Sequence, residues 1–112
     1  MAELDKKLNV LLAEDEARLQ VVMQLWLTRA GHKIVLTRNG QEALERLTTE
    51  SFDVLITDVN MPVMNGIELV RRLFANNQSP DLIVILTSRC DVEDLQKEFA
   101  APQVHVFAKP FN

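Results

Sequence analysis

The sequence predicts a doubly wound α/β domain, in which helices cover both faces of a mostly parallel β-sheet. Short runs rich in Val, Ile and Leu alternate along the chain with segments whose apolar residues recur every three to four positions. The apolar runs carry apolar residues at consecutive positions, as strands do when both of their faces are buried. Strands that alternate with helices imply right-handed crossovers and hence parallel pairing. The 112 residues suffice for one such domain and its single core.

Five segments are predicted as strands because each is a short apolar run bounded by turn residues or by a helical segment. They are residues 8–13, 33–37, 54–57, 82–86 and 104–107. Asn39-Gly40 is predicted as a turn after the second strand, and Ser79-Pro80 interrupts the chain before the fourth. The sequence ends five residues after the last predicted strand, so a fifth helix is expected to be missing.

Four segments are predicted as helices because their apolar residues fall on one face. The first ends at Gly31, which is expected to form a left-handed cap. The other three are residues 41–50, 67–76 and about 91–100. The apolar stripe of the first helix consists of Leu19, Val22, Met23, Trp26, Leu27 and Ala30. Because Trp26 belongs to this stripe, we expect it to lie in the core.

The composition excludes several classes of protein. With 12 basic and 16 acidic side chains the net charge is −4, and no run of Lys or Arg is present, which argues against direct nucleic-acid binding. The longest apolar run has five residues, whereas a membrane span needs ~20, and the N-terminus has no apolar signal core. A single cysteine, Cys90, agrees with a reducing compartment. We therefore expect a cytoplasmic protein that is neither secreted nor embedded in a membrane.

Polar residues follow four of the predicted strands, at the edge where doubly wound sheets bind their ligands. These residues are Glu14-Asp15, Asp58, Thr87-Ser88 and Lys109-Pro110. Asp53 precedes the third strand and belongs to the opposite edge, ~17 Å away. Taken singly, each of these side chains is explained as a helix cap, a turn cap or a surface charge. Their convergence on one edge favours a functional site.

Three clustered carboxylates repel one another unless a proton or a cation is bound. Magnesium prefers oxygen ligands of this kind, and His32 and His105 lack the spacing of a soft-metal site and are interpreted as structural. Magnesium and Lys109 would neutralise a transferring phosphoryl group, Thr87 would donate a hydrogen bond to it, and one carboxylate would attack it. The strand ends therefore predict a phosphoryl-transfer site.

The motifs resemble those of the receiver domain of two-component response regulators, in particular the chemotaxis-regulator type. Residues 58–66, D-V-N-M-P-V-M-N-G, are similar to the family signature D-x-x-M-P-x-M-[DN]-G. Glu14-Asp15 stand where the family keeps its metal-binding acids, and Lys109-Pro110-Phe111 match its K-P-F. The resemblance covers essentially the whole chain, so residues 1–112 are expected to form one receiver domain that is short at its C-terminus.

The resemblance implies a flavodoxin-like strand order, 2-1-3-4-5, which brings Glu14-Asp15 beside Asp58. It also implies that Asp58 accepts a phosphoryl group from a histidine kinase, from a histidine phosphotransfer protein or from a small donor such as acetyl phosphate. Such a phosphorelay switch promotes its own phosphorylation and dephosphorylation and is not a classical enzyme. Its output domain or target protein is not implied by these residues.

Other roles are also implied by the resemblance. Thr87 and Lys109 would assist the transfer, and Mg²⁺ would be held by the three acids together with the backbone carbonyl of Asn60. The Lys109-Pro110 bond would be cis. Arg89 either borders the phosphoryl group or is a solvated arginine.

Two features depart from the family pattern. Val106 stands where receivers usually have a Tyr or Phe that turns inward on activation, and the fifth helix is missing. Either the chain is a piece of a longer protein or its sheet is covered in another way. Because an uncovered sheet face is apolar, we expect the chain to form a homodimer or exchange elements through the face that the missing helix leaves open, or to be less stable than a version extended by a natural C-terminal segment.

Two other functions stay open as alternatives. A receiver-like interaction module that does not depend on phosphate is suggested by Val106 and the missing helix. An enzyme of the same topology is disfavoured, because Glu14-Asp15 would repel a flavin phosphate. Aspartyl-phosphate hydrolases place a second Asp two residues after the nucleophile, where this chain has Asn60.

Overall fold

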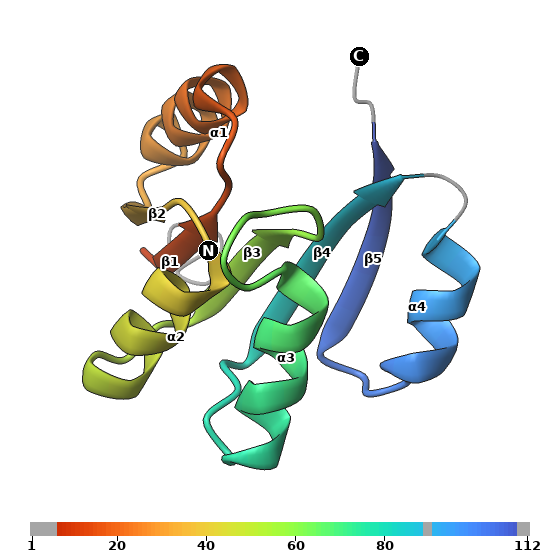
Figure 1. Ribbon diagram of the computed structural model, residues 1–112. Coiled ribbons are helices and arrows are strands. Elements are labelled where there is room, and N and C mark those ends of the chain that lie inside the picture. The colour runs from red at the N-terminus through yellow and green to blue at the C-terminus, as the bar shows by residue number, and fades with distance from the viewer. Residues whose placement is uncertain (1–6, 89–90, 110–112) are drawn as a thin grey trace.

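The computed structural model describes residues 7–88 and 91–109. Five parallel strands form one sheet in the order β2-β1-β3-β4-β5, which confirms the flavodoxin-like topology (Figure 1). The strands are β1 (Asn9–Ala13), β2 (Lys33–Thr37), β3 (Val54–Asp58), β4 (Leu82–Ser88) and β5 (Val104–Lys109). The helices of the described residues are α1 (Ala17–Arg29), α2 (Gly40–Thr49), α3 (Gly66–Ala75) and α4 (Val92–Glu98).

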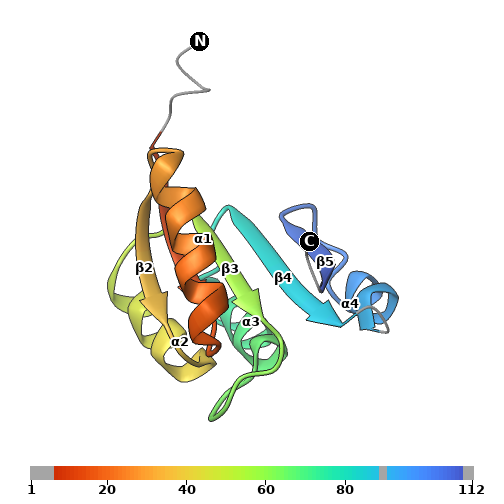
Figure 2. The same ribbon diagram turned by 90° about the horizontal axis from the view of Figure 1, so that it is seen from above.

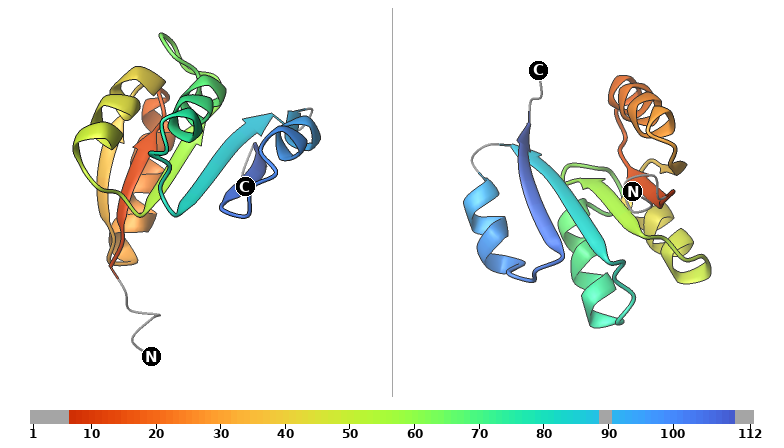
Figure 3. Two further views of the ribbon diagram at one scale, coloured as in Figure 1. Left: turned by 90° about the horizontal axis from the view of Figure 1, so that it is seen from below. Right: turned by 180° about the vertical axis from the view of Figure 1, so that it is seen from behind.

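The helices cover the two faces of the sheet unequally. Of the helices in the described residues, α2, α3 and α4 lie on one face and α1 lies on the other (Figures 1 and 3). The larger core fills the face under α2, α3 and α4, and its fully buried side chains include Leu11, Leu55, Leu69, Leu73 and Ile83. The smaller core, under α1, consists of Val10, Leu12, Val54, Ile56 and Leu86. The sheet is therefore thickly covered on one side and thinly on the other.

Three strands run further toward the site than the sequence predicts. The ladder continues through the pairs Asp58↔Leu86 and Ser88↔Lys109, so Asp58, Ser88 and Lys109 end their strands and do not follow them. Apolar content alone placed these ends too early, because the last residues of β3, β4 and β5 are polar while their backbones still pair. Most of the candidate site is thus fixed by the sheet itself.

Two helix ends can be traced to single residues. Gly31 has a φ of +94°, and the amides of Gly31 and His32 donate to the carbonyls of Thr28 and Leu27, which confirms the predicted left-handed cap on α1. The predicted turn at Asn39-Gly40 lies one residue earlier, because the chain bends at Arg38 and Asn39. The Asn39 side chain accepts a hydrogen bond from the Glu42 amide at 2.9 Å, so Asn39 caps α2 and Gly40 is its first residue.

The prediction that Trp26 belongs to the core is wrong. Trp26 is 61% exposed, and α1 has no buried residue at all. Met23 and Leu27 are the residues of the helix that pack on the smaller core. Viewed from above, α1 crosses the β2, β1 and β3 side of the sheet, and no helix of the described residues covers β4 and β5 on that face (Figure 2). Trp26 lines a groove at this uncovered side of α1, and Phe107 of β5 lines the same groove.

None of the helices in the described part of the chain is long and apolar enough to cross a membrane.

Candidate functional site

Three carboxylates meet where β1 and β3 end. Glu14 and Asp15 follow β1, and Asp58 is the last residue of β3. The two strands are neighbours, with Ala13 paired to Thr57, so the residues that come next lie close together. One carboxylate oxygen from each acid lies within 4.8 Å of the other two. Glu14 and Asp58 are buried, whereas Asp15 is exposed.

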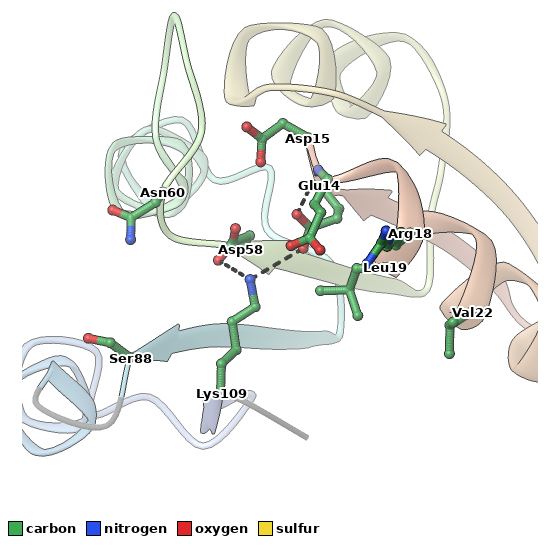
Figure 4. A pocket seen from close by; sticks show the side chains of 10 residues that line it. Glu14, Asp15, Arg18, Leu19, Val22, Asp58, Asn60, Ser88 and Lys109 are labelled. Carbon is green, nitrogen blue, oxygen red and sulfur yellow. Dashed lines mark hydrogen bonds and ion pairs between the residues drawn. The ribbon is translucent and has the colours of Figure 1, made fainter. Parts of the chain in front are cut away.

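A lysine from the edge strand reaches into this cluster. Lys109 Nζ lies 3.1 Å from Asp58 Oδ1 and 3.6 Å from Glu14 Oε1 (Figure 4). Lys109 ends β5 opposite Ser88 of β4, so its side chain crosses the end of β4 to reach the acids. Lys109 of β5 therefore contributes to the site, as predicted.

The backbone around Asp58 fixes the position of its carboxylate. The Val59 amide donates to Asp58 Oδ1 at 2.8 Å, and the buried Thr57 hydroxyl donates to the Asp58 carbonyl at 2.9 Å. The loop after β3 then folds back, because the Gly66 amide donates to the Val59 carbonyl at 2.9 Å. A Cβ atom on Gly66 would lie only 2.1 Å from the Asp58 carbonyl oxygen, so no other residue fits there. The backbone that carries Asp58, the predicted phosphoryl acceptor, is therefore held in place by hydrogen bonds.

The acids and the lysine perturb one another. Burial raises the pKa of Glu14, and the charges of Asp58 and Asp15 raise it further. The amide of Glu16 and the ammonium of Lys109 lower that pKa, and the net shift is upward. Partial burial lowers the pKa of Lys109, but its contacts with Asp58 and Glu14 outweigh burial and raise it overall. Lys109 is therefore charged at neutral pH. The ionised form of Glu14 is destabilised by burial and by the neighbouring acids.

The donor set fits a hard divalent cation. Three carboxylates face a single ammonium, so the ionised cluster carries a net negative charge. Among the described residues, Glu14 Oε1 is buried without a hydrogen-bond partner. All the available donor atoms are oxygens, which is the preference of Mg²⁺. Glu14, Asp15 and Asp58 are hence suitable ligands.

A cleft of about 690 Å³ opens onto the cluster. It is lined by Glu14, Asp15, Glu16, Arg18, Leu19, Val22, Asp58, Asn60, Ser88 and Lys109. Asn60 lies at this cleft as the sequence predicts. Glu16, Arg18 and the α1 wall of the cleft were not among the predicted site residues. The helical period directly after the acidic pair could have located Arg18 and Leu19, since it puts residues three and four positions on over the same strand end.

Thr87 lies beside the cleft and does not line it. Its side chain is almost fully buried, and its hydroxyl has no hydrogen-bond partner among the described residues. Side chains alternate along β4, so Ser88 lines the cleft and donates to Asp91 Oδ2 at 3.0 Å. Of the predicted site residues, the structure brings together the three acids, Asn60 and Lys109, with Thr87 next to them.

The helix-cap explanations of these residues do not hold. The N-cap of α1 is Glu16 and that of α4 is Asp91, so neither the acidic pair nor Thr87 is a helix cap. Asp53 lies at the opposite edge, as predicted, and accepts from the Asn9 amide at 2.8 Å.

The remaining sequence predictions concern the two histidines and residues near the C-terminal ends of β4 and β5. His32 is structural, since its Nδ1 accepts a hydrogen bond from the Leu8 amide at 3.2 Å, and His105 is exposed. The predictions for Arg89 and the cis Lys109-Pro110 bond fall outside the described residues.

Comparison with known proteins agrees with this geometry. The family model of the response regulator receiver domain matches residues 10–112. The chain belongs to this family. It is 38% identical over 105 residues to the response regulator receiver protein CpdR of Brucella abortus, a match that covers 93% of this chain and 86% of CpdR. Several other relatives are longer, and the chain spans less than half of their length.

Solved structures of the family have the same fold. The chemotaxis response regulator CheY4 of Vibrio cholerae superposes with a TM-score of 0.83 at 32% identity, covering 96% of this chain and 90% of CheY4. The response regulator TrrA of Thermotoga maritima, solved in complex with Mg²⁺-BeF, gives 0.79 at 27% identity, covering 93% and 88%. Receivers of this family act in two-component signalling with histidine kinases and output domains, and they bind Mg²⁺ in an acidic pocket.

Proposed function

We propose that this chain is a phosphorylation switch whose acceptor is Asp58 and whose donor is a histidine kinase or a histidine phosphotransfer protein. One observation carries the proposal. The Asp58 carboxylate is held at 3.1 Å from a lysine ammonium, beside two further acids and at an open cleft. A structural ion pair needs neither the extra acids nor the cleft. Family membership supports the same assignment.

In the proposed reaction a carboxylate oxygen of Asp58 attacks the phosphorus of the donor. The P–N bond of phosphohistidine, or the P–O bond of acetyl phosphate, breaks, and its electron pair leaves with the imidazole or the acetate. An aspartyl phosphate results. Lys109 compensates negative charge on the phosphoryl oxygens, and the Thr87 hydroxyl, which has no partner among residues 7–88 and 91–109, donates to one of them. Hydrolysis of the aspartyl phosphate resets the switch.

Glu14, Asp15 and Asp58, with the backbone carbonyl of Asn60, would hold Mg²⁺. A bound Mg²⁺ supplies positive charge that neutralises the phosphoryl oxygens during transfer. The acids of this chain do the positioning: Asp15, the exposed member, is open to solvent, whereas Glu14 reaches the site from a fully buried position. We assign a direct contact to Asp15 and Asp58 and a water-mediated one to Glu14, because Mg²⁺ usually keeps several waters.

The proposal also covers the wider role of the chain. Residues 1–112 act as one cytoplasmic receiver domain that promotes its own phosphorylation and dephosphorylation and is not a classical enzyme. Its phosphorylated form signals to an output domain or a separate target protein. Neither a nucleic acid nor a membrane is a direct partner.

A second copy of the chain is the proposed occupant of the uncovered sheet face. Trp26 and Phe107 are more than half exposed, and they line a groove of about 450 Å³ between α1 and β5. Its lining is wholly uncharged, so two negatively charged copies could meet there without opposing like charges. An apolar surface of this kind is usually covered in soluble proteins.

Intact mass spectrometry after incubation with acetyl phosphate and Mg²⁺ tests the switch. The wild type should gain the mass of one phosphoryl group, and a chelator should prevent the gain. Asp58→Ala should abolish it, while the control Asp53→Ala, at the other end of the same strand, should keep it. A gain that survives Asp58→Ala would place the acceptor elsewhere, and the absence of any gain would favour the phosphate-independent interaction module.

A further inference from the structure

Arg18 is the one cationic residue of the cleft lining whose charge the phosphoryl-transfer proposal does not use. It lies in the first turn of α1 and lines the same cleft as the three acids and Lys109 (Figure 4). Its side chain is exposed. It forms no ion pair with any residue in the ranges 7–88 and 91–109. By contrast, Lys109 is already engaged by Asp58 and Glu14.

The position of Arg18 runs against the charge pattern of the other helices. The first turns of α2, α3 and α4 carry acidic residues and their last turns carry basic ones, which suits the helix dipole. In α1 the first turn has no acidic residue, and Arg18 places a positive charge there. A cation at that end opposes the helix dipole. The arginine therefore does not stabilise its own helix.

The charges around the cleft suggest what Arg18 does. Glu14, Glu16, Asp15 and Asp58 line the cleft against Lys109 and Arg18, so the entrance repels a phosphate dianion. A guanidinium is well suited to phosphate oxygens, because it stays charged and presents several N–H donors in one plane.

We propose that Arg18 is a specificity-determining residue that attracts and contacts the anionic phosphoryl donor at the mouth of the cleft. This inference rests on the proposed function, since it concerns the donor for Asp58. Arg18 acts on the approach of the phosphate and takes no part in holding Mg²⁺. Its effect should grow with the negative charge of the donor and shrink as salt screens it.

The test compares rates of Asp58 phosphorylation at saturating Mg²⁺ in the wild type, Arg18→Gln, Arg18→Lys and Arg29→Gln. Arg29 is the matched control, because it is an arginine of the same helix roughly 17 Å further along its axis and does not line the cleft. With acetyl phosphate at low salt, Arg18→Gln should be slower by about three- to fivefold, and at high salt by less than about twofold. Arg18→Lys should keep most of the rate and Arg29→Gln all of it.

Two further readouts separate donor attraction from a structural role. Phosphoramidate, which carries less negative charge than acetyl phosphate at neutral pH, should show a smaller difference between the wild type and Arg18→Gln. The Mg²⁺ affinity of Arg18→Gln should be unchanged or higher, since a positive charge has been removed near the acids. A wild-type rate in Arg18→Gln, an equal loss in Arg29→Gln, or a parallel fall in Mg²⁺ affinity would overturn the inference. If the wild type itself is not phosphorylated on Asp58, the proposed function fails, and this inference fails with it.

Discussion

Lys109 and Asp58 form an ion pair at 3.1 Å although their strands, β5 and β3, are separated in the sheet by β4. The contact requires that all three strands end at one edge and that Lys109 extends across the end of β4 (Figure 4). Because only the far end of a flexible side chain makes the contact, the ammonium can stay close to Asp58 when the carboxylate gains a phosphoryl group. The sheet thus fixes the acceptor and leaves the counter-charge movable.

Replacement of Asp15 should weaken Mg²⁺ binding and phosphorylation together. Asp15→Asn keeps the shape of the side chain and removes one of three clustered charges, so we expect a loss of Mg²⁺ affinity of about tenfold or more. A Mg²⁺ titration followed by amide chemical shifts measures it, and the acetyl phosphate rate should fall in the same variant. An affinity equal to that of the wild type would show that Asp15 is not a ligand.

Replacement of Glu14 should stabilise the metal-free protein at neutral pH. The pKa of Glu14 is raised in the folded state, so the folded protein binds this proton more tightly than the unfolded chain does. The stabilisation of the folded state by this tighter proton binding is present below pH 4.5, the ordinary pKa of Glu, and is lost as the pH rises through the pKa of the folded state. With a chelator at pH 7, Glu14→Gln should therefore raise the free energy of unfolding by roughly 1 kcal/mol.

Denaturant unfolding at several pH values measures this difference. It should shrink toward zero as the pH falls below 4.5, because the wild-type carboxyl is then protonated. A gain that is the same at all pH values would mean that packing, not charge, distinguishes the two side chains.

Activation should act through the end of β4 and the start of α4. Val106 is buried and has no ring to reorient, whereas the Thr87 hydroxyl is buried without a partner in the described structure. A phosphoryl mimic would give that hydroxyl an acceptor. Beryllofluoride with Mg²⁺ should thus shift the amide signals of Thr87, Ser88 and Val92 in the wild type, and Thr87→Ala should reduce the shifts severalfold. Unshifted signals in this segment would favour the interaction module.

The uncovered face of the sheet should make the chain self-associate. Trp26 is 61% exposed beside Phe107, so a second copy should bury both. Light scattering over a range of concentrations should show a mass that rises toward that of a dimer, and Trp26→Lys should hold it at the monomer value by placing a charge in the contact. A wild type that stays monomeric at high concentration and binds little hydrophobic dye would contradict the dimer.

The sequence was sufficient for the alternation of strands and helices, because apolar runs and apolar periodicity report burial directly. The strand order followed from the resemblance of residues 58–66 to the receiver-domain signature, because the local sequence of a strand does not show which strands it pairs with. Polar strand ends such as Asp58 and Ser88 were placed outside the sheet, because apolar content says nothing about backbone pairing. Trp26 was misplaced for a similar reason: its position on the apolar stripe does not tell whether another element covers it, and in the structure it is 61% exposed.

Identification of the phosphorylated residue tests the central claim most directly. Borohydride reduces an aspartyl phosphate to homoserine, which marks the acceptor with a permanent change of mass. After treatment with acetyl phosphate and Mg²⁺, reduction and proteolysis, peptide mass spectrometry should find homoserine at Asp58 and leave Asp15 and Asp53 unchanged. Homoserine at another acid, with Asp58 intact, would contradict the account.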